Sequence, residues 1–142
     1  DSTVPLKTFR IYDAAHNEVF RMTKELLHVL PTYRFYLYEE PYGTLQKKFA
    51  LVKDRFSMEL PEGTLELMEY AGSIGHNYRV TLNGKMLGAI MDNMDLTIQN
   101  VFFDNAFLIV YDTRYLPQLT ALAVMTARDL ARDKDGALPN RR

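Results

Sequence analysis

One long apolar run decides the fold of this chain: Tyr115-Leu-Pro-Gln-Leu-Thr-Ala-Leu-Ala-Val-Met-Thr-Ala-Arg-Asp-Leu-Ala131. Pro117 suits the first turn of a helix, because the backbone N–H that proline lacks is not needed there. From Leu119 to Ala127 every side of a helical wheel is apolar or small, and such a helix must be surrounded by other groups. We therefore predict a buried helix over Leu116 to Arg132.

The residues before this helix form short segments in which apolar and polar side chains alternate, which is typical of half-buried β-strands. Asn83-Gly84 is the strongest turn signal, because both central positions of a type I′ hairpin need positive φ. It predicts that Lys85 to Met91 returns antiparallel to Tyr78 to Leu82. The continuous apolar segment Phe107 to Tyr111 is expected to be a strand buried on both faces. The sequence thus predicts a mainly β protein that closes around one C-terminal helix.

Residues that favour turns predict where the strands end. The expected turns are Asp13 to Asn17, Pro41 to Gly43, Lys53-Asp54, Pro61 to Gly63 and Asp104-Asn105. Lys24 to Leu30, closed by Pro31, is expected to be strand or loop. Leu96 to Phe103 is expected to be a strand, and the charged tail 133–142 is expected to fray.

Alternation also predicts which side chains fill the core. In one strand Tyr33, Phe35 and Leu37 share a face, and the tyrosines between them share the other. The predicted core comprises Phe9, Ile11, Tyr33, Phe35, Leu37, Phe56, Met58, Val80, Leu82, Ile98, Phe107, Ile109, Leu119, Leu122, Ala123 and Leu130.

The composition is that of an ordinary globular domain, and 142 residues favour a single domain over 1–142. A net charge of -1 gives no overall attraction to nucleic acid or to anionic membranes. Cysteine is absent, which excludes disulfides and thiolate metal sites and is compatible with the cytoplasm. The chain begins with Asp1 and shows no secretory signal. The apolar run is shorter than the ~20 residues of a membrane span.

Lys47, Lys48, Lys53 and Arg55 form the strongest local concentration of charge. One interpretation is a patch that binds phosphate or anionic lipid, worth ~1 kcal/mol per cation near an anionic bilayer. The other is a solvated strand edge whose lysines discourage pairing. Strand alternation places Lys47 and Lys48 on opposite faces, so the four cations cannot all converge.

Signals for catalysis are weak. The three histidines have no metal-ligand spacing, and no metal or cofactor is expected. A hydrolytic set of Ser73, His76 and Asp92 lacks a supporting motif such as Gly-x-Ser-x-Gly. The acidic residues Glu62, Glu66 and Glu69 are expected to be solvated surface, and Glu39-Glu40 to flank a turn. The glutamates beside the aromatic strand argue against a nucleic-acid partner.

The order of these features resembles a known family. The stretches that carry the resemblance are Phe9-Arg-Ile-Tyr-Asp13, Asn17-Glu-Val-Phe20, Leu30-Pro-Thr-Tyr33, Lys47-Lys-Phe49, Arg55-Phe-Ser-Met58, Tyr78-Arg-Val80, Asn83-Gly-Lys85 and the apolar terminal helix. Together they resemble the LURP-one-related proteins, which share the tubby C-terminal-like fold with tubby and the phospholipid scramblases. The resemblance implies a closed antiparallel barrel threaded by the helix.

The chain departs from that family at its start, because members usually carry a further strand or hairpin before the segment that matches Phe9 to Asp13. A barrel without it would expose an edge. Either the N-terminus has been lost, or the barrel is open, or a neighbouring chain fills the gap. The resemblance implies little about catalysis, and the phosphoinositide-binding motif of tubby does not map onto positions here. We predict a non-enzymatic binding or scaffold domain, cytoplasmic and peripheral at a membrane, for which the resemblance makes anionic lipid the expected ligand. The alternatives are a protein-interaction module that uses an exposed strand edge, and a small hydrolase.

Overall fold

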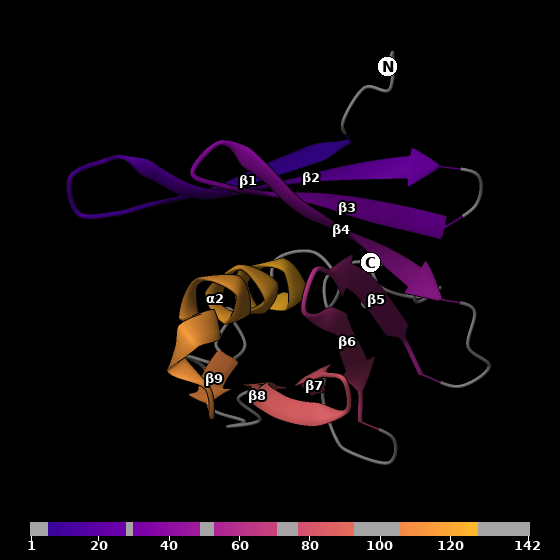
Figure 1. Ribbon diagram of the computed structural model, residues 1–142. Helices are drawn as coiled ribbons and strands as arrows, with labels where there is room; N and C mark the ends of the chain where they lie inside the picture. The colour runs from indigo at the N-terminus through magenta and orange to yellow at the C-terminus, as the bar shows by residue number, and fades with distance from the viewer. Residues whose placement is uncertain (1–5, 28–29, 49–52, 71–76, 93–105, 128–142) are drawn as a thin grey trace, which may run out of the picture.

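Nine strands, each hydrogen-bonded to the next, form one antiparallel sheet, and a helix follows the last strand (Figure 1). The computed structural model describes residues 6–27, 30–48, 53–70, 77–92 and 106–127. The elements are β1 (Lys7–Tyr12), β2 (Glu18–Leu27), β3 (Leu30–Leu37), β4 (Glu40–Lys48), β5 (Arg55–Leu60), β6 (Gly63–Glu69), β7 (Tyr78–Leu82), β8 (Lys85–Asp92), β9 (Ala106–Val110), the short 3-10 turn η1 (Thr113–Tyr115) and α2 (Leu116–Met125). The mainly β, antiparallel prediction is confirmed.

The sheet is curved, and α2 lies against its inner face. Strands β1 to β4 pass above the helix, β5 and β6 lie to its right, and β7 to β9 lie beneath it (Figure 1). The helix contacts β2 and β9. The inner face supplies most of the buried side chains, which are Phe20, Met22, Tyr33, Phe35, Leu45, Phe56, Met58, Leu60, Leu65, Leu67, Tyr78, Val80, Leu87 and Ile90, and the helix adds Leu119, Ala121, Leu122 and Met125.

Two hydrogen bonds tie the start of α2 to the sheet. The Gln118 amide donates to the Tyr42 hydroxyl at 3.2 Å, and the Tyr115 hydroxyl donates to the Glu62 carboxylate at 2.8 Å. Burial raises the pKa of Tyr42. The predicted helix is confirmed in position, but the α-helix ends at Met125, and residues 128–132 lie outside the described part. Ala123, expected in the core, is only partly buried.

The Asn83-Gly84 hairpin is confirmed. Both residues have positive φ, 51° and 83°, and Leu82 pairs with Lys85 across the turn. The Asn83 side chain donates to the Glu62 carbonyl at 3.0 Å and accepts from the Thr64 N–H at 3.0 Å. This turn is therefore fastened to the neighbouring turn between β5 and β6.

The expected break at Pro41 to Gly43 is wrong, because these residues lie within β4. The chain turns earlier, at Tyr38-Glu39, where both residues have positive φ. A shift in register between Phe35 and Tyr36 absorbs the extra residue in β4.

Pro31 does not end a segment either, since it lies in β3 opposite Leu26. Pairing of β3 with β4 begins only at Thr32, so the missing N–H of Pro31 breaks no bond to β4. Lys24 to Leu27 belongs to β2, so of the two expected structures, strand or loop, this part of the segment forms a strand.

The prediction for β9 is wrong in one respect, because only one of its faces is buried. Phe107, Ile109 and Tyr111 are 60%, 41% and 64% exposed, whereas Leu108 and Val110 pack against the core. The alternation shows that, among the described residues, no second layer covers the outer face of β9. Phe107 and Ile109 are therefore not core residues. The predicted core residues Ile98 and Leu130, the predicted strand Leu96 to Phe103 and the tail 133–142 lie outside the described residues.

Candidate functional site

The four cations predicted as a phosphate patch divide between the two faces of the sheet, as their alternation requires. Lys47 lies opposite the buried Phe56, which places it on the inner face, and Lys48 lies opposite Arg55 on the outer face. The four cations therefore do not converge on one point, although all of them lie near the same end of the sheet.

The outer pair consists of Lys48 and Arg55, two like charges directly across neighbouring strands. The Arg55 guanidinium donates to the Glu66 carboxylate at 2.7 Å, so this acid on β6 offsets one of the two charges. Lys48 is exposed. Since exposed ion pairs contribute only ~0–1 kcal/mol, Arg55 can exchange its partner easily.

The two remaining cations, Lys47 and Lys53, each lie beside a carboxylate. The Lys47 ammonium lies 3.3 Å from the Asp54 carboxylate, and the Lys53 ammonium lies 3.9 Å from the Glu69 carboxylate. Glu69 is buried, and its carboxylate accepts the Asp54 N–H at 3.4 Å. The expectation of a solvated Glu69 is wrong, because the β6 register places it opposite Tyr78 on the inner face.

Two further lysines lie at the same end of the inner face. Lys7 and Lys24 are directly opposite each other in β1 and β2, and the Lys24 ammonium is 5.8 Å from the centre of the Tyr33 ring. Sequence reasoning missed both, although the pairing of β1 with β2 would have aligned them. We name the set Lys7, Lys24, Lys47, Lys48 and Lys53 the lysine rim.

The lysine rim runs along one end of the sheet. Because consecutive strands are antiparallel, the start of β1, the ends of β2 and β4 and the approach to β5 all lie at this end. With ~4.8 Å between neighbouring strands, the five lysines extend over roughly 20 Å. The rim is therefore too long to converge on one small anion and fits an extended surface.

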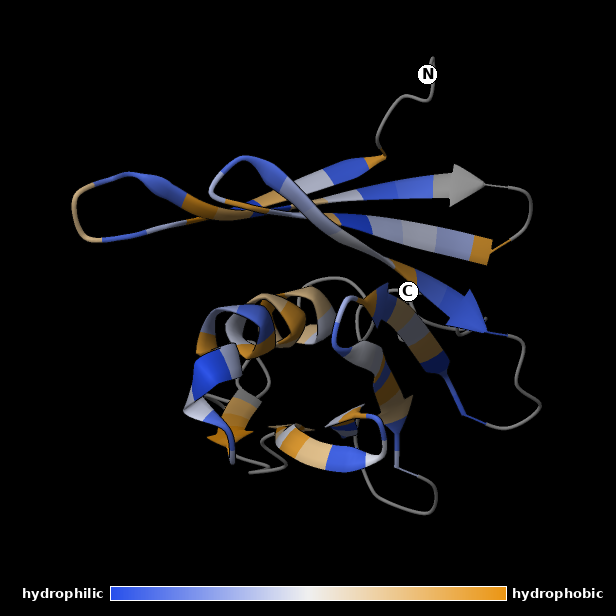
Figure 2. Ribbon diagram, viewed as in Figure 1, coloured by the Kyte–Doolittle hydropathy of each residue, from blue (hydrophilic) through white to orange (hydrophobic). Residues whose placement is uncertain are grey.

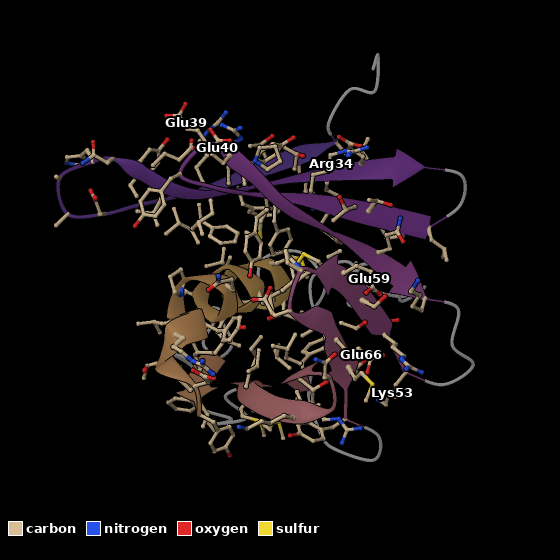
Figure 3. The ribbon with its side chains drawn as sticks, viewed as in Figure 1. Arg34, Glu39, Glu40, Lys53, Glu59 and Glu66 are labelled. Carbon is tan, nitrogen blue, oxygen red and sulfur yellow. The ribbon has the colours of Figure 1, made fainter. Side chains whose placement is uncertain are left out.

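Acidic residues gather at the opposite end, in the hairpin turns. Asp13, Glu39, Glu40 and Glu62 occupy or flank the turns that join β1–β2, β3–β4 and β5–β6, and Asp112 follows β9. Figure 3 shows Glu39 and Glu40 at the upper left and Lys53 at the lower right. Lysines thus predominate at one end of the sheet and acids at the other, with Asp54 and Glu69 among the lysines and Lys85 and Arg114 beside Asp112.

Local bonds keep two of these acids ionised. The backbone N–H groups of Asn17 and Ala15 each donate to the Asp13 carboxylate at 2.9 Å and lower its pKa. Arg114 donates to both oxygens of Asp112, at 3.0 and 2.7 Å, which lowers the pKa of Asp112 to about 2. Asp13 and Asp112 are therefore ionised throughout the neutral range.

The outer face of β1 to β3 carries a second charged cluster, which is largely self-paired. Glu18 bridges Arg10 and Arg21 at 3.1 and 3.0 Å, and the Arg21 guanidinium lies 4.4 Å from the centre of the Tyr36 ring. Arg34 donates to Glu25 at 2.8 Å, a bond that raises the pKa of Arg34.

A depression of about 190 Å³ lies beside this cluster, at the irregular pairing of β3 with β4. Its lining residues are Arg34, Phe35, Tyr36, Pro41, Tyr42, Gly43 and Thr44. Arg34 is the cation in that lining, whereas five lysines gather along the rim, so the lysine rim is the better candidate for an anionic surface.

Within the described ranges, no group of three or more histidine, cysteine, aspartate or glutamate residues could hold a metal ion. Ser73 and His76 of the suggested hydrolytic set lie outside those ranges, as does the side chain of Asp92. In the part of the chain that the structure describes, no helix is long and apolar enough to cross a bilayer.

Comparison with known proteins finds no matching family, no matching curated protein and no matching solved structure. The likeness to the LURP-one-related proteins stays an expectation from the sequence.

Proposed function

We propose that this chain is a non-catalytic binding domain whose lysine rim contacts phosphate groups on an anionic membrane surface. The observation that carries the proposal is the separation of charge along the strands. Lysines from β1, β2, β4 and the approach to β5 share one end, while acidic residues occupy or flank the β1–β2, β3–β4 and β5–β6 turns at the other end. Such a molecule presents its basic end to an anionic surface and turns its acidic end away.

The expected affinity is low. Each lysine near an anionic bilayer contributes ~1 kcal/mol, so five lysines set a limit of about 5 kcal/mol. Asp54 and Glu69, which lie beside Lys47 and Lys53, lower that limit. Binding in the millimolar to high micromolar range follows, and added salt should abolish it, because the attraction decays over ~8 Å at physiological ionic strength.

The finer architecture belongs to the same proposal. The resemblance to the LURP-one-related family implies a closed tubby-like barrel, in the cytoplasm and peripheral at a membrane. Two observations support that architecture: the sheet order follows the chain from β1 to β9, and α2 lies against the inner face. Closure within one chain would need β1 and β9 to be joined, either directly or by another strand. In the open form of the same barrel, the outer edge of β9 is available to a neighbouring chain.

Co-sedimentation with vesicles tests the lipid contact. The protein should pellet with vesicles that contain phosphatidylserine and remain in solution with phosphatidylcholine alone. The variant Lys7→Gln, Lys48→Gln, Lys53→Gln should lose this binding, because it removes three charges from the rim.

A matched control is Arg10→Gln, Lys85→Gln, Arg114→Gln, which removes the same charge from other parts of the molecule. This control should bind anionic vesicles like the wild type if the position of the lysines determines binding. It should lose binding if only the net charge of the protein matters. Equal pelleting of the wild type with both kinds of vesicle would disprove the lipid proposal.

A further inference from the structure

Strand β9 presents an exposed apolar stripe at an edge of the sheet. Phe107, Ile109 and Tyr111 alternate along it and point away from the core, and Met91 on β8 lies opposite Phe107. Residues 106–111 carry no charge. Within the residues that the structure describes, β8 is the one strand paired with β9, so the other edge of β9 has no strand beside it. In Figure 2, β9 is largely orange, the colour of hydrophobic residues.

The other edge of the sheet is built differently. Strand β1 carries Lys7 and Arg10, and its pairing with β2 shifts register between Ile11 and Tyr12. Charges and irregular register are the devices that keep edge strands from pairing with other chains. The described part of β9 has neither device, so the two edges do not have the same role.

We propose that β9 is the contact between two copies of this chain, which pair β9 to β9 in antiparallel orientation about a two-fold axis at Ile109. This register places Ile109 opposite itself and Phe107 opposite Tyr111. The three exposed apolar side chains of each copy then meet on the same face of a continuous sheet. Cross-strand pairs of this kind are the unit by which antiparallel sheets are stabilised.

A second copy fits this edge better than a charged partner does. The stripe offers no charge to attract an acidic or basic chain, and it is complementary to itself, which a two-fold contact requires. Pairing of β9 with β1 of another copy would set Lys7 and Arg10 beside apolar residues, and this heterologous contact would extend into a ring or a filament rather than stop at two copies. The β9 pair does close, and it gives a dimer rather than a fibre.

The size of the stripe predicts a weak dimer. A buried aromatic side chain covers ~150–250 Å², so the exposed parts of Phe107, Ile109 and Tyr111 sum to roughly 300 Å² per copy. Twice that area is below the ~1,200 Å² of a stable interface. The dimer should therefore form only as the protein concentration rises.

Sedimentation velocity of the full chain over a wide concentration range tests this proposal. The weight-average mass should rise toward the dimer, and Ile109→Lys should weaken the association about tenfold or more, because two like charges would face each other at the axis. Tyr12→Lys, a matched change on the opposite edge, should leave association unchanged.

Crosslinking gives a second measurement that does not depend on a destabilising variant. The chain has no cysteine, so Ile109→Cys places one thiol per copy at the axis, where opposing Cα atoms ~4.5–5.5 Å apart permit a disulfide. Oxidation should yield a disulfide-linked dimer, and Tyr12→Cys should not.

Two results would overturn the proposal. One is a monomer at every concentration together with no Ile109→Cys crosslink. The other is a loss of association in Tyr12→Lys equal to that in Ile109→Lys, since this would show that β9 pairs with β1. Neither sedimentation nor crosslinking involves lipid, so a negative result for the dimer would not count against lipid binding by the lysine rim.

Discussion

At the scale of single residues, Gly88 sets how closely β8, β9 and α2 approach. A Cβ at this position would lie 2.5 Å from the Ile109 carbonyl oxygen and 3.1 Å from Leu119. The carbonyl belongs to the backbone of β9 and cannot move without disturbing the sheet. Gly88→Ala should therefore lower the free energy of unfolding by ~1–3 kcal/mol, measured by chemical denaturation.

The substitution Gly43→Ala is a matched control for Gly88→Ala. A Cβ there would also meet an atom at 2.5 Å, but that atom is the sulfur of Met58, at the flexible end of a side chain. Because methionine repacks easily, Gly43→Ala should cost less than Gly88→Ala. Equal losses would show that the backbone of β9 is not what makes Gly88 necessary.

The lowered pKa of Asp112 predicts how the stability of the protein changes in acid. The pKa of this carboxyl is lowered from 3.8 to about 2, chiefly by the hydrogen bonds from Arg114. The stabilisation is therefore complete above pH ~4, the ordinary range of the carboxyl, and is lost as the pH falls toward 2. In thermal melts Asp112→Asn should lower the melting temperature at pH 7 and flatten its decline between pH 4 and pH 2. A variant whose decline parallels that of the wild type would contradict this role.

At the scale of elements, α2 contains two alanines, Ala121 and Ala123, that are buried to different extents. Ala121 is completely buried, whereas Ala123 is partly buried. A charge at Ala121 would be buried without a partner, so Ala121→Asp should cost about 3 kcal/mol or more and abolish the cooperative thermal transition. Ala123→Asp should remain folded with a lower melting temperature. If Ala123→Asp is the more damaging change, the assigned helix face is wrong.

Sequence predicted those elements that depend on local chemistry. The Asn83-Gly84 hairpin follows from the φ angles that its turn requires, and the helix follows from its all-round apolarity. The break at Pro41 to Gly43 could not be excluded, because the pairing of β4 with β3 overrides the local preference of these residues for a turn. The exposed face of β9 was missed since an apolar run has the same appearance in a covered strand and at an uncovered edge.

At the scale of the whole molecule, the charged ends emerge only from the register of the strands. Lys7 and Lys24 are seventeen positions apart and meet because β1 and β2 are antiparallel. The pattern Lys47 to Arg55 drew attention to one end of the sheet, and the register then adds Lys7 and Lys24 to that end. Strand alternation alone was sufficient to separate Lys47 from Lys48. It could not show that Asp54 and Glu69 lie beside the inner lysines.

The position of α2 in the chain has a consequence for synthesis on the ribosome. Residues 116–125 emerge after every described strand, yet they fill the inner face of strands as early as β2. Until they emerge, the growing chain carries an apolar concave surface with nothing to cover it. Translation of the last strands is therefore the period in which the nascent protein most needs a chaperone. A message that terminates shortly before the helix would yield an aggregating product rather than a slightly shorter functional one.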